Sequence, residues 1–312
     1  MPSTVPASHA SWGRCYFAFQ SMAGLAWWIL VFGSIWVRDT TLGGLDPVLV
    51  AIFDVPLFVI ASAAAALGSR VAVKVTAGWT VTVAVVLALY ATITTQAGWG
   101  VLLMGAASAG SLVAACLMIF GRVPTEWILK GPFAFRAAGE RVTAVPHVAS
   151  TMLQLLFFWG LFLGLIPWIL AFLEQRWGVT AGLPAWVGAV GASVFLLGSA
   201  LGVSSAITMS TLGRGTPLPS AMPNRLVIAG PYRWVRNPMA VAGIGQGVAV
   251  GLMLGSWMVI TYAAAGSLVW NYAVRPLEEA DLEGRFGEDF RRYRANVQCW
   301  IPRLRAQSGS PL

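Results

Sequence analysis

Long apolar stretches dominate this chain and constrain its fold more than any other feature. Six of them, near residues 15–37, 47–68, 71–93, 99–120, 148–173 and 183–208, are long enough for a helix of about 20 residues that crosses roughly 30 Å of hydrocarbon. A seventh stretch, 239–274, has 36 residues and is interrupted near Gly255-Ser256. Because it is too long for one crossing and slightly short for two, we expect a tight helical hairpin. The sequence therefore predicts an all-α, polytopic transmembrane bundle of about eight helices.

The composition excludes a water-soluble globule. Only 10% of the residues are charged and 57% are hydrophobic, whereas a soluble domain carries about 25% charged residues. The N-terminus lacks the pattern of a cleaved signal peptide, so we expect the first stretch to remain as a membrane anchor. Cys15, Cys116 and Cys299 are scattered and form no CxxC pair, which predicts neither a disulfide framework nor a metal site and fits a reducing compartment.

The charges predict an orientation. With eight crossings and both termini in the cytoplasm, eighteen of the 20 Lys and Arg residues fall on the cytoplasmic side, and only Arg38 and Arg176 fall outside. Lys and Arg collect on the cytoplasmic side of membrane proteins. The net charge of +8 is thereby explained without a nucleic-acid partner, and we expect a multi-pass protein of the plasma membrane with the bilayer as its partner.

The first long polar connection divides the chain. We expect a four-helix transmembrane region over 1–120, a cytoplasmic linker over 121–147, and a second transmembrane region with a C-terminal cytoplasmic cap over 148–312. Asp54 lies inside the second apolar stretch. An intramembrane carboxylate is costly and marks a functional candidate, but we favour the alternative that it lies near a helix end or bonds the backbone freed by Pro56.

Two polar segments flank the predicted hairpin. In the first, Gly230-Pro231 predicts a turn and Pro238 suits the first position of the next helix. The segment between them brings backbone N–H groups and two guanidinium groups, Arg233 and Arg236, to a helix N-terminus. Such a segment suits an anion or a carboxylate, although it is equally typical of a loop that anchors in the headgroup region.

The second polar segment follows Pro276. Its apolar residues recur at intervals of mostly three and four, which predicts a cytoplasmic amphipathic helix; they are Leu277, Leu282, Phe286, Phe290, Tyr293 and Val297. The alternative is a surface helix that only tethers the tail. Asn271, Arg275 and Glu279 follow each other at steps of four, so we expect them on one helix face, forming one wall of a site.

These segments resemble a known family. The pairing of Gly230-Pro-Tyr-Arg-Trp-Val-Arg-Asn-Pro238 with Arg275-x-x-Glu-Glu-x-x-Leu-x-x-x-Phe-Gly-x-x-Phe-x-x-Tyr293 resembles the isoprenylcysteine carboxyl methyltransferases, and is similar to the membrane phospholipid methyltransferases. The motifs cover roughly 210–305. Asn237 stands where the family usually has His, Ala240 where it has Tyr, and Phe290 where it has the first Tyr of the tail.

The resemblance implies an integral membrane methyltransferase that uses S-adenosylmethionine. Its acceptor would be lipophilic, an isoprenoid carboxylate, a phospholipid or similar, and would enter from the bilayer. The residues matching the cofactor motif are Gly230, Pro231, Tyr232, Arg236, Asn237, Pro238, Glu278 and Glu279. The implied catalytic residues are Arg275, Glu279 and Asn271. Arg275 could position a carboxylate acceptor, whereas Glu278 or Glu279 could accept a proton from an amine or hydroxyl acceptor.

Two other functions remain open from the sequence. A membrane reductase of the sterol type would use NADPH, and Arg214 and Arg225 could bind its 2′-phosphate. A transporter would need broken helices and intramembrane acids; Asp54 is the sole acid inside an apolar stretch, and the two halves show no internal repeat. The sequence predicts no oligomeric state.

Overall fold

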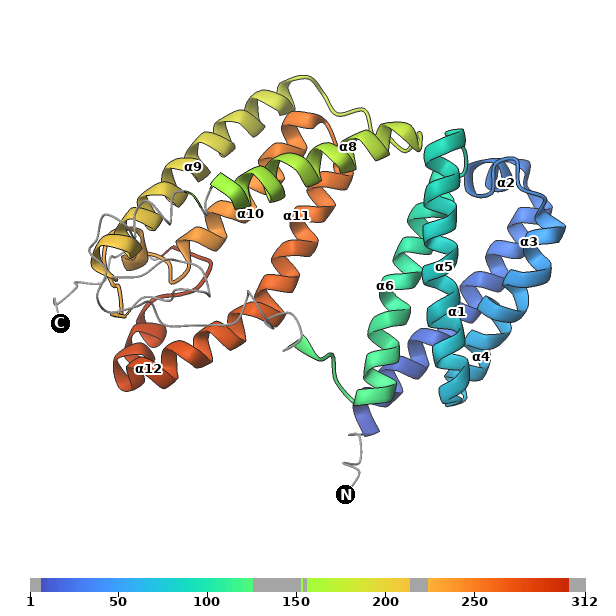
Figure 1. Cartoon of the computed structure of the whole chain (residues 1–312), viewed down its shortest axis with the longest axis horizontal. Coiled ribbons are helices and arrows are strands. Elements are labelled where there is room, and N and C mark those ends of the chain that lie inside the picture. The colour runs from blue at the N-terminus through green and yellow to red at the C-terminus, as the bar shows by residue number, and fades with distance from the viewer. Residues whose placement is uncertain (1–6, 126–152, 154–155, 214–223, 303–312) are drawn as a thin grey trace. The chain divides into compact units, whose positions relative to one another are not determined.

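The structure, a computed structural model, describes residues 7–125, 153, 156–213 and 224–302 (Figure 1). Every regular element in these ranges is a helix, which confirms the predicted all-α class. The chain forms two compact units, one comprising 1–124 with 173–179 and the other comprising 125–172 with 180–312.

The first unit is a bundle of apolar helices. Its elements are α1 (Ala7–Gly33), α2 (Ile35–Thr41), α3 (Pro47–Asp54), the π-helix η1 (Val55–Ile60), α4 (Ala61–Ala66), α5 (Arg70–Thr94) and α6 (Gly98–Phe120). The first helix ends four residues earlier than predicted because the Ser34 side chain accepts from the backbone N–H of Val37 and so caps a new short helix.

Hydrogen-bonded polar side chains connect the helices inside this unit. Gln20 on α1 donates to Ser62 on α4 at 3.0 Å and accepts from Ser111 on α6 at 2.8 Å. Ser62 also bonds Thr76 on α5 at 3.0 Å. All four side chains are buried, and each has a partner, as buried polar groups require.

Asp54 has two side-chain partners in the structure. The indole N–H of Trp28 donates to Oδ2 at 2.9 Å, and that of Trp79 donates to Oδ1 at 2.8 Å. Asp54 is the last residue of α3, directly before η1, and its described partners are these two indoles and not backbone freed by Pro56. The indoles join α1, α3 and α5 at one buried carboxylate. The sequence did not reveal these partners because they lie 26 and 25 residues away.

The second unit contains the predicted hairpin. Its elements are the π-helix η4 (Gly160–Leu165), α8 (Ile166–Arg176), α9 (Trp186–Leu212), the short 3₁₀ helix η6 (Gly230–Arg233), α10 (Pro238–Leu254), α11 (Trp257–Val269), the π-helix η7 (Trp270–Val274) and α12 (Arg275–Asn296). The last four residues of α8 belong to the first unit. α10 packs along α9 and then against α11 (Figure 1). Gly255, at φ +62°, ends α10, and Ser256 caps α11.

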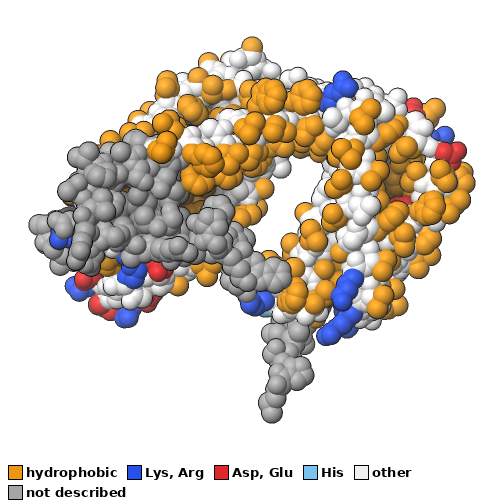
Figure 2. All heavy atoms as spheres, in the orientation of Figure 1, with side chains coloured by type: hydrophobic (Ala, Val, Ile, Leu, Met, Phe, Trp, Pro, Cys, Tyr) orange, Lys and Arg blue, Asp and Glu red, His pale blue; other side chains and the backbone are white. Residues whose placement is uncertain are grey.

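In the part of the chain that the structure describes, six helices are long and apolar enough to cross a membrane: His9–Gly33, Pro47–Ala66, Arg70–Thr94, Gly98–Phe120, Leu156–Arg176 and Trp186–Leu212. Hydrophobic side chains cover the sides of the helices in view (Figure 2). The chain is thus a multi-pass membrane protein. The predicted count of eight is not reached by these criteria, because α10 has 17 residues and α11 only 13.

The C-terminal amphipathic helix differs from its prediction. α12 is broken at Gly287, where φ is 52° and ψ is −123°, so the sequence expected as one helix forms two segments. The second segment packs through Phe290, Tyr293 and Val297, with Leu282 and Phe286 of the first segment against them. The break lets apolar residues of both segments face one cluster.

Candidate functional site

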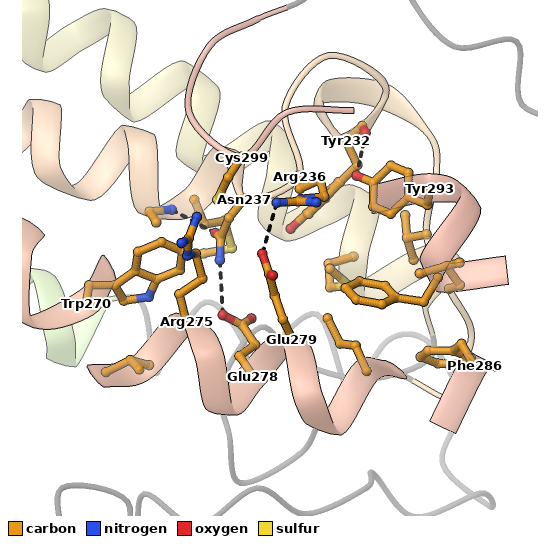
Figure 3. Close-up of a pocket in the computed structure, with 18 of the residues that line it drawn as sticks. Tyr232, Arg236, Asn237, Trp270, Arg275, Glu278, Glu279, Phe286, Tyr293 and Cys299 are labelled. Carbon is orange, nitrogen blue, oxygen red and sulfur yellow. Dashed lines mark hydrogen bonds and ion pairs between the residues drawn. The ribbon is translucent and has the colours of Figure 1, made fainter. Parts of the chain in front are cut away.

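A pocket of about 360 Å³ lies in the second unit, where the end of α9, the start of α10 and both segments of α12 meet. Its polar lining comprises Arg225, Tyr232, Arg236, Asn237, Arg275, Glu278, Glu279, Tyr293 and Cys299. Its apolar lining comprises Met209, Leu226, Val227, Met239, Ala240, Trp270, Val274, Leu282, Phe286 and Phe290. Charged groups and an apolar wall therefore share one cavity (Figure 3).

The turn before α10 shapes one side of the pocket. Gly230 has φ +52°, and a Cβ there would approach Thr208 Oγ1 at 2.9 Å, so glycine suits this position on both grounds. Asn237 is the N-cap of α10: its Oδ1 accepts from the backbone N–H of Ala240 at 3.0 Å. Its Nδ2 donates to Glu278 Oε2 at 3.3 Å. One amide thus starts the helix and holds a pocket carboxylate.

The two adjacent acids of α12 have different partners. Glu279 forms an ion pair with Arg236 at 3.1 Å, and both side chains are mostly buried. Glu278 has no described cation within ion-pair distance and is held by the Asn237 amide (Figure 3). Burial, and then the charges of Glu279 and Asp281, raise the pKa of Glu278 to about 7, although the hydrogen bond from Asn237 opposes the shift.

Arg236 connects three parts of the site. Besides its ion pair with Glu279, its guanidinium donates to the backbone carbonyl of Arg294 at 3.1 Å. Its backbone N–H donates to the carbonyl of Gln298 at 3.0 Å. The turn is thereby joined to both segments of α12 and to the chain beyond them. The hydroxyl of Tyr293 adds a fourth link by donating to the carbonyl of Tyr232 at 2.6 Å.

Arg275 is a half-buried cation of the pocket without a described counter-charge. Its Nε is buried without a hydrogen-bond partner, and no described acid lies within ion-pair distance of it. It interacts with the thiol of Cys299, whose pKa is raised by burial, with Arg275 and Arg236 opposing that shift. A buried guanidinium without a counter-charge favours an anionic group in the pocket.

Asn271 lies apart from the other predicted residues. It does not line the pocket, and its Oδ1 accepts from the indole N–H of Trp300 at 3.0 Å. The expectation that it shares a wall with Arg275 and Glu279 assumed an α-helical period. The π-helix η7 changes that period over Trp270–Val274, and Trp270 lines the pocket instead.

The other predicted residues divide into two groups. Tyr232, Arg236, Asn237, Glu278 and Glu279 line the pocket together with Arg275, whereas Gly230, Pro231 and Pro238 do not and set the backbone path. Sequence reasoning did not assign Trp270, Cys299, Met209 or Met239 to the site. The spacing of apolar residues in the tail predicted that Phe286, Phe290 and Tyr293 pack inward. Such spacing does not show whether an inward-facing residue lines a pocket or belongs to the core.

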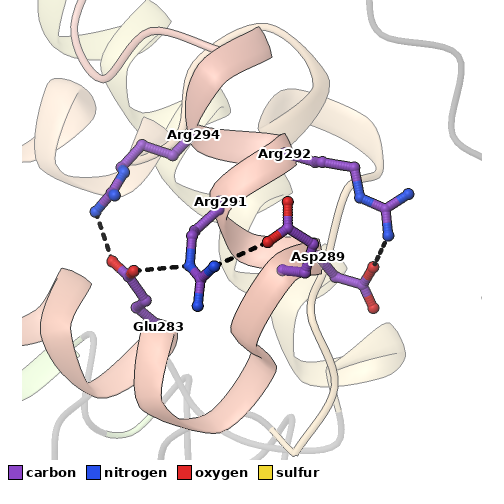
Figure 4. Close-up of polar contacts among 6 residues, drawn as sticks. Glu283, Asp289, Arg291, Arg292 and Arg294 are labelled. Atoms are coloured by element: carbon purple, nitrogen blue, oxygen red, sulfur yellow. Dashed lines mark hydrogen bonds and ion pairs between the residues drawn. The ribbon is translucent and has the colours of Figure 1, made fainter.

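Exposed ion pairs connect the two segments of α12. Glu283, before the break, accepts from Arg291 at 3.0 Å and from Arg294 at 2.8 Å, both after it (Figure 4). Arg291 also pairs with Glu288 at 2.9 Å. Each such pair contributes about 0–1 kcal/mol at a solvated surface, so we attribute the closed arrangement mainly to the apolar cluster beneath.

The lining residues fit a nucleoside cofactor that carries both an amino and a carboxyl group. The volume lies within the roughly 300–1,000 Å³ of small-molecule sites. The buried Nε atoms of Arg236 and Arg275 have no partners and suit a carboxylate, Glu279 suits an ammonium group, and the aromatic rings suit an adenine base. Among the described residues, no group of three or more His, Cys, Asp and Glu could hold a metal ion.

A model of the phospholipid methyltransferase family matches residues 186–289, from α9 into the second segment of α12. This part of the chain is phospholipid-methyltransferase-like. The match confirms the resemblance predicted from the two motifs and contains every pocket residue from Met209 to Phe286. No curated protein matches the chain significantly. Together with the membrane-spanning helices, the match supports an integral membrane methyltransferase.

Proposed function

We propose that the protein transfers a methyl group from S-adenosylmethionine to a lipophilic acceptor that enters the pocket from the bilayer. The observation that carries the proposal is one cavity with two acids, an unpaired buried guanidinium and an apolar wall, inside the segment that is similar to phospholipid methyltransferases. Fold-level likeness alone would be weaker support, because a fold does not fix a function.

The charged lining suits the cofactor. When bound, S-adenosylmethionine supplies a methyl group on a positively charged sulfur. Tyr232, Arg236, Asn237 and Glu279 would hold it. Their positions are fixed beforehand by the ion pair between Arg236 and Glu279, the hydrogen bond from Asn237 to Glu278, and the hydrogen bond from Tyr293 to the carbonyl of Tyr232. Because such a transfer needs little covalent help, orientation of the two reactants is the main contribution and supplies about 7–11 kcal/mol of the barrier in favourable cases.

The apolar lining suits the acceptor. Met209 near the end of α9, Met239 at the start of α10 and Trp270 after α11 all line the cavity. These helices are the apolar ones of the second unit, so their ends provide a hydrophobic path to the same cavity. Arg275, at the start of α12, would hold an anionic group of the acceptor or of the cofactor.

The proposal is tested with purified protein and two measurements. Incubation with methyl-labelled S-adenosylmethionine and a total lipid extract should give a labelled lipid, and calorimetry should detect binding of S-adenosylhomocysteine. Glu279→Gln should weaken that binding because it removes the ion pair with Arg236. Glu288→Gln is the matched control, since Glu288 is an exposed acid of the same helix outside the pocket. No binding by the wild type, together with no labelled lipid, would refute the proposal.

NADPH is the second candidate cofactor. Arg225 lines the pocket, is exposed and has no described partner, so it could bind a 2′-phosphate. Calorimetry with NADPH and, separately, with S-adenosylhomocysteine decides between a reductase and a methyltransferase. We expect binding heat from S-adenosylhomocysteine and none from NADPH.

A further inference from the structure

We propose that Glu278, and not Glu279, is the proton acceptor of this pocket, so that the methyl acceptor is a lipophilic amine or alcohol and not a carboxylate. The inference rests on the proposed methyl transfer. It assigns separate roles to two adjacent acids that the sequence alone left interchangeable.

The geometry separates the two carboxylates. Glu279 is paired with Arg236 at 3.1 Å, and Arg236 is in turn bonded to the carbonyl of Arg294. These contacts hold the Glu279 side chain in position and occupy its carboxylate. Glu278 lines the same cavity with only a 3.3 Å hydrogen bond from the Asn237 amide. Of the two, Glu278 is therefore the one whose oxygen atoms are available to take a proton.

The surroundings of Glu278 tune its proton affinity. The groups that face this part of the pocket are Glu279, Arg275 and Tyr293 of α12, Tyr232, Arg236 and Asn237 of the turn before α10, Arg225, and Cys299 of the C-terminal segment. Asp281 of α12 lies outside the pocket but acts on Glu278 through its charge. Burial and the two neighbouring acids bring its pKa to about 7. A general base works best when its pKa lies near the working pH, because it is then ionised and still basic.

The other titratable groups that line the described pocket are less suited. The Tyr293 hydroxyl is engaged as a donor to Tyr232, and burial raises the pKa of both tyrosines above their ordinary range. Burial also raises the pKa of the Cys299 thiol. The arginines remain protonated and cannot accept a proton.

The step balances with Glu278 in this role. The lone pair of the acceptor nitrogen or oxygen forms a bond to the methyl carbon, the bond from that carbon to sulfur breaks, and the electron pair stays on sulfur as a neutral thioether. The proton of the acceptor passes to a carboxylate oxygen of Glu278. A carboxylate acceptor has no proton to lose, and it would have to approach two acids.

The labelled lipid identifies the acceptor class. A methyl ester releases its label as volatile methanol in mild alkali, whereas an N-methyl group or a methyl ether retains it. We expect the label to be stable to alkali. Volatile label would overturn the inference while leaving methyl transfer intact, and the absence of any label from the wild type would instead refute the proposed function.

The residue assignment is tested by Glu278→Gln, which keeps the shape of the side chain. The methyl-transfer rate should fall by about 10²–10⁴-fold, while S-adenosylhomocysteine binding should be unchanged. Loss of binding in parallel with rate would make Glu278 a cofactor ligand and overturn the inference, as would an unchanged rate. The wild-type rate should rise with pH through about 7, because the base must be ionised.

Asp281→Asn provides a matched variant. Asp281 does not line the pocket, but its charge raises the pKa of Glu278. Removing it should move the rise of the rate to lower pH and leave the plateau rate unchanged. A pH profile that does not move would contradict the assignment of that titration to Glu278.

Discussion

Glu278 links function to stability at the level of a single residue. Its pKa is about 7 in the folded protein against an ordinary value of 4.5, so the folded state binds its proton more tightly than the unfolded state does. The stability that the folded state gains from binding this proton is therefore fully present below about pH 4.5 and is lost as the pH rises through 7. Keeping this group available for proton transfer therefore lowers the stability of the folded protein at neutral pH, as functional groups often do.

Glu278→Gln should therefore raise the unfolding temperature at pH 8 relative to wild type, and should give no such gain at pH 5. The reason is that the variant has no carboxylate to ionise inside the pocket. Thermal unfolding of the purified protein in detergent at the two pH values measures the difference. Glu288→Gln, at an exposed site, should show no pH-dependent gain, and an equal shift of Glu278→Gln at both pH values would contradict the explanation.

At this scale the sequence predicted charged pocket residues better than neutral ones. Arg236, Arg275 and Glu279 were assigned from their motifs and line the cavity. Trp270 and Cys299 were not assigned, because nothing in an apolar or isolated residue distinguishes a pocket wall from a core. Asn271 was assigned and lies outside the pocket, since one π-turn alters which side chains share a face.

At the scale of elements, the break in α12 determines how the pocket is closed. The second segment carries Phe290 and Tyr293 to the cavity only because the chain turns at Gly287. A Cβ at this position would meet nothing within 4 Å, so the requirement for glycine comes from the positive φ and not from crowding.

Gly287→Ala should therefore loosen the second segment. A non-glycine residue in a sparsely populated backbone region costs about 1–3 kcal/mol, and amide hydrogen exchange over 288–296 should become faster accordingly. Gly284→Ala is the matched control: this glycine is in the same helix, is exposed, and has an ordinary backbone conformation with open space around it. It should slow exchange slightly, because alanine favours a helix by roughly 0.5–1 kcal/mol over glycine. Equal effects of the two variants would refute the argument.

The elements that the sequence predicted well are those with local signals. Pro238 begins α10 as expected, and Gly255-Ser256 divides the hairpin. The break at Gly287 was missed because the apolar residues on both sides continue a helical spacing through it. Local spacing reports which residues are buried, whereas the direction of the chain at a glycine depends on the tertiary cluster that the two segments share.

At the scale of the whole molecule, charge and hydrophobicity are separated along the chain. The described ion pairs all involve residues 236–294, whereas the first unit is held by apolar packing and by hydrogen bonds, in which its charged side chains bind neutral partners. We propose that 1–120 acts as an accessory membrane region, that 121–147 links it to the rest, and that the methyl-transfer chemistry belongs to 148–312.

The distribution of Lys and Arg makes a topological prediction for the first unit. Asp39, beside Arg38 after the first helix, should face the outside, and Leu67, which precedes Arg70 and Lys74, should face the cytoplasm. Both side chains are exposed, so Asp39→Cys and Leu67→Cys, in a chain whose three native cysteines are replaced by serine, can be labelled. A membrane-impermeant maleimide added to intact cells should label only Asp39→Cys, and in inside-out vesicles only Leu67→Cys. The reverse pattern would show that the topology is inverted, with Arg38 on the cytoplasmic side and the more numerous basic residues on the outside. Labelling of both sites from one side would show that the 47–66 helix does not cross the membrane.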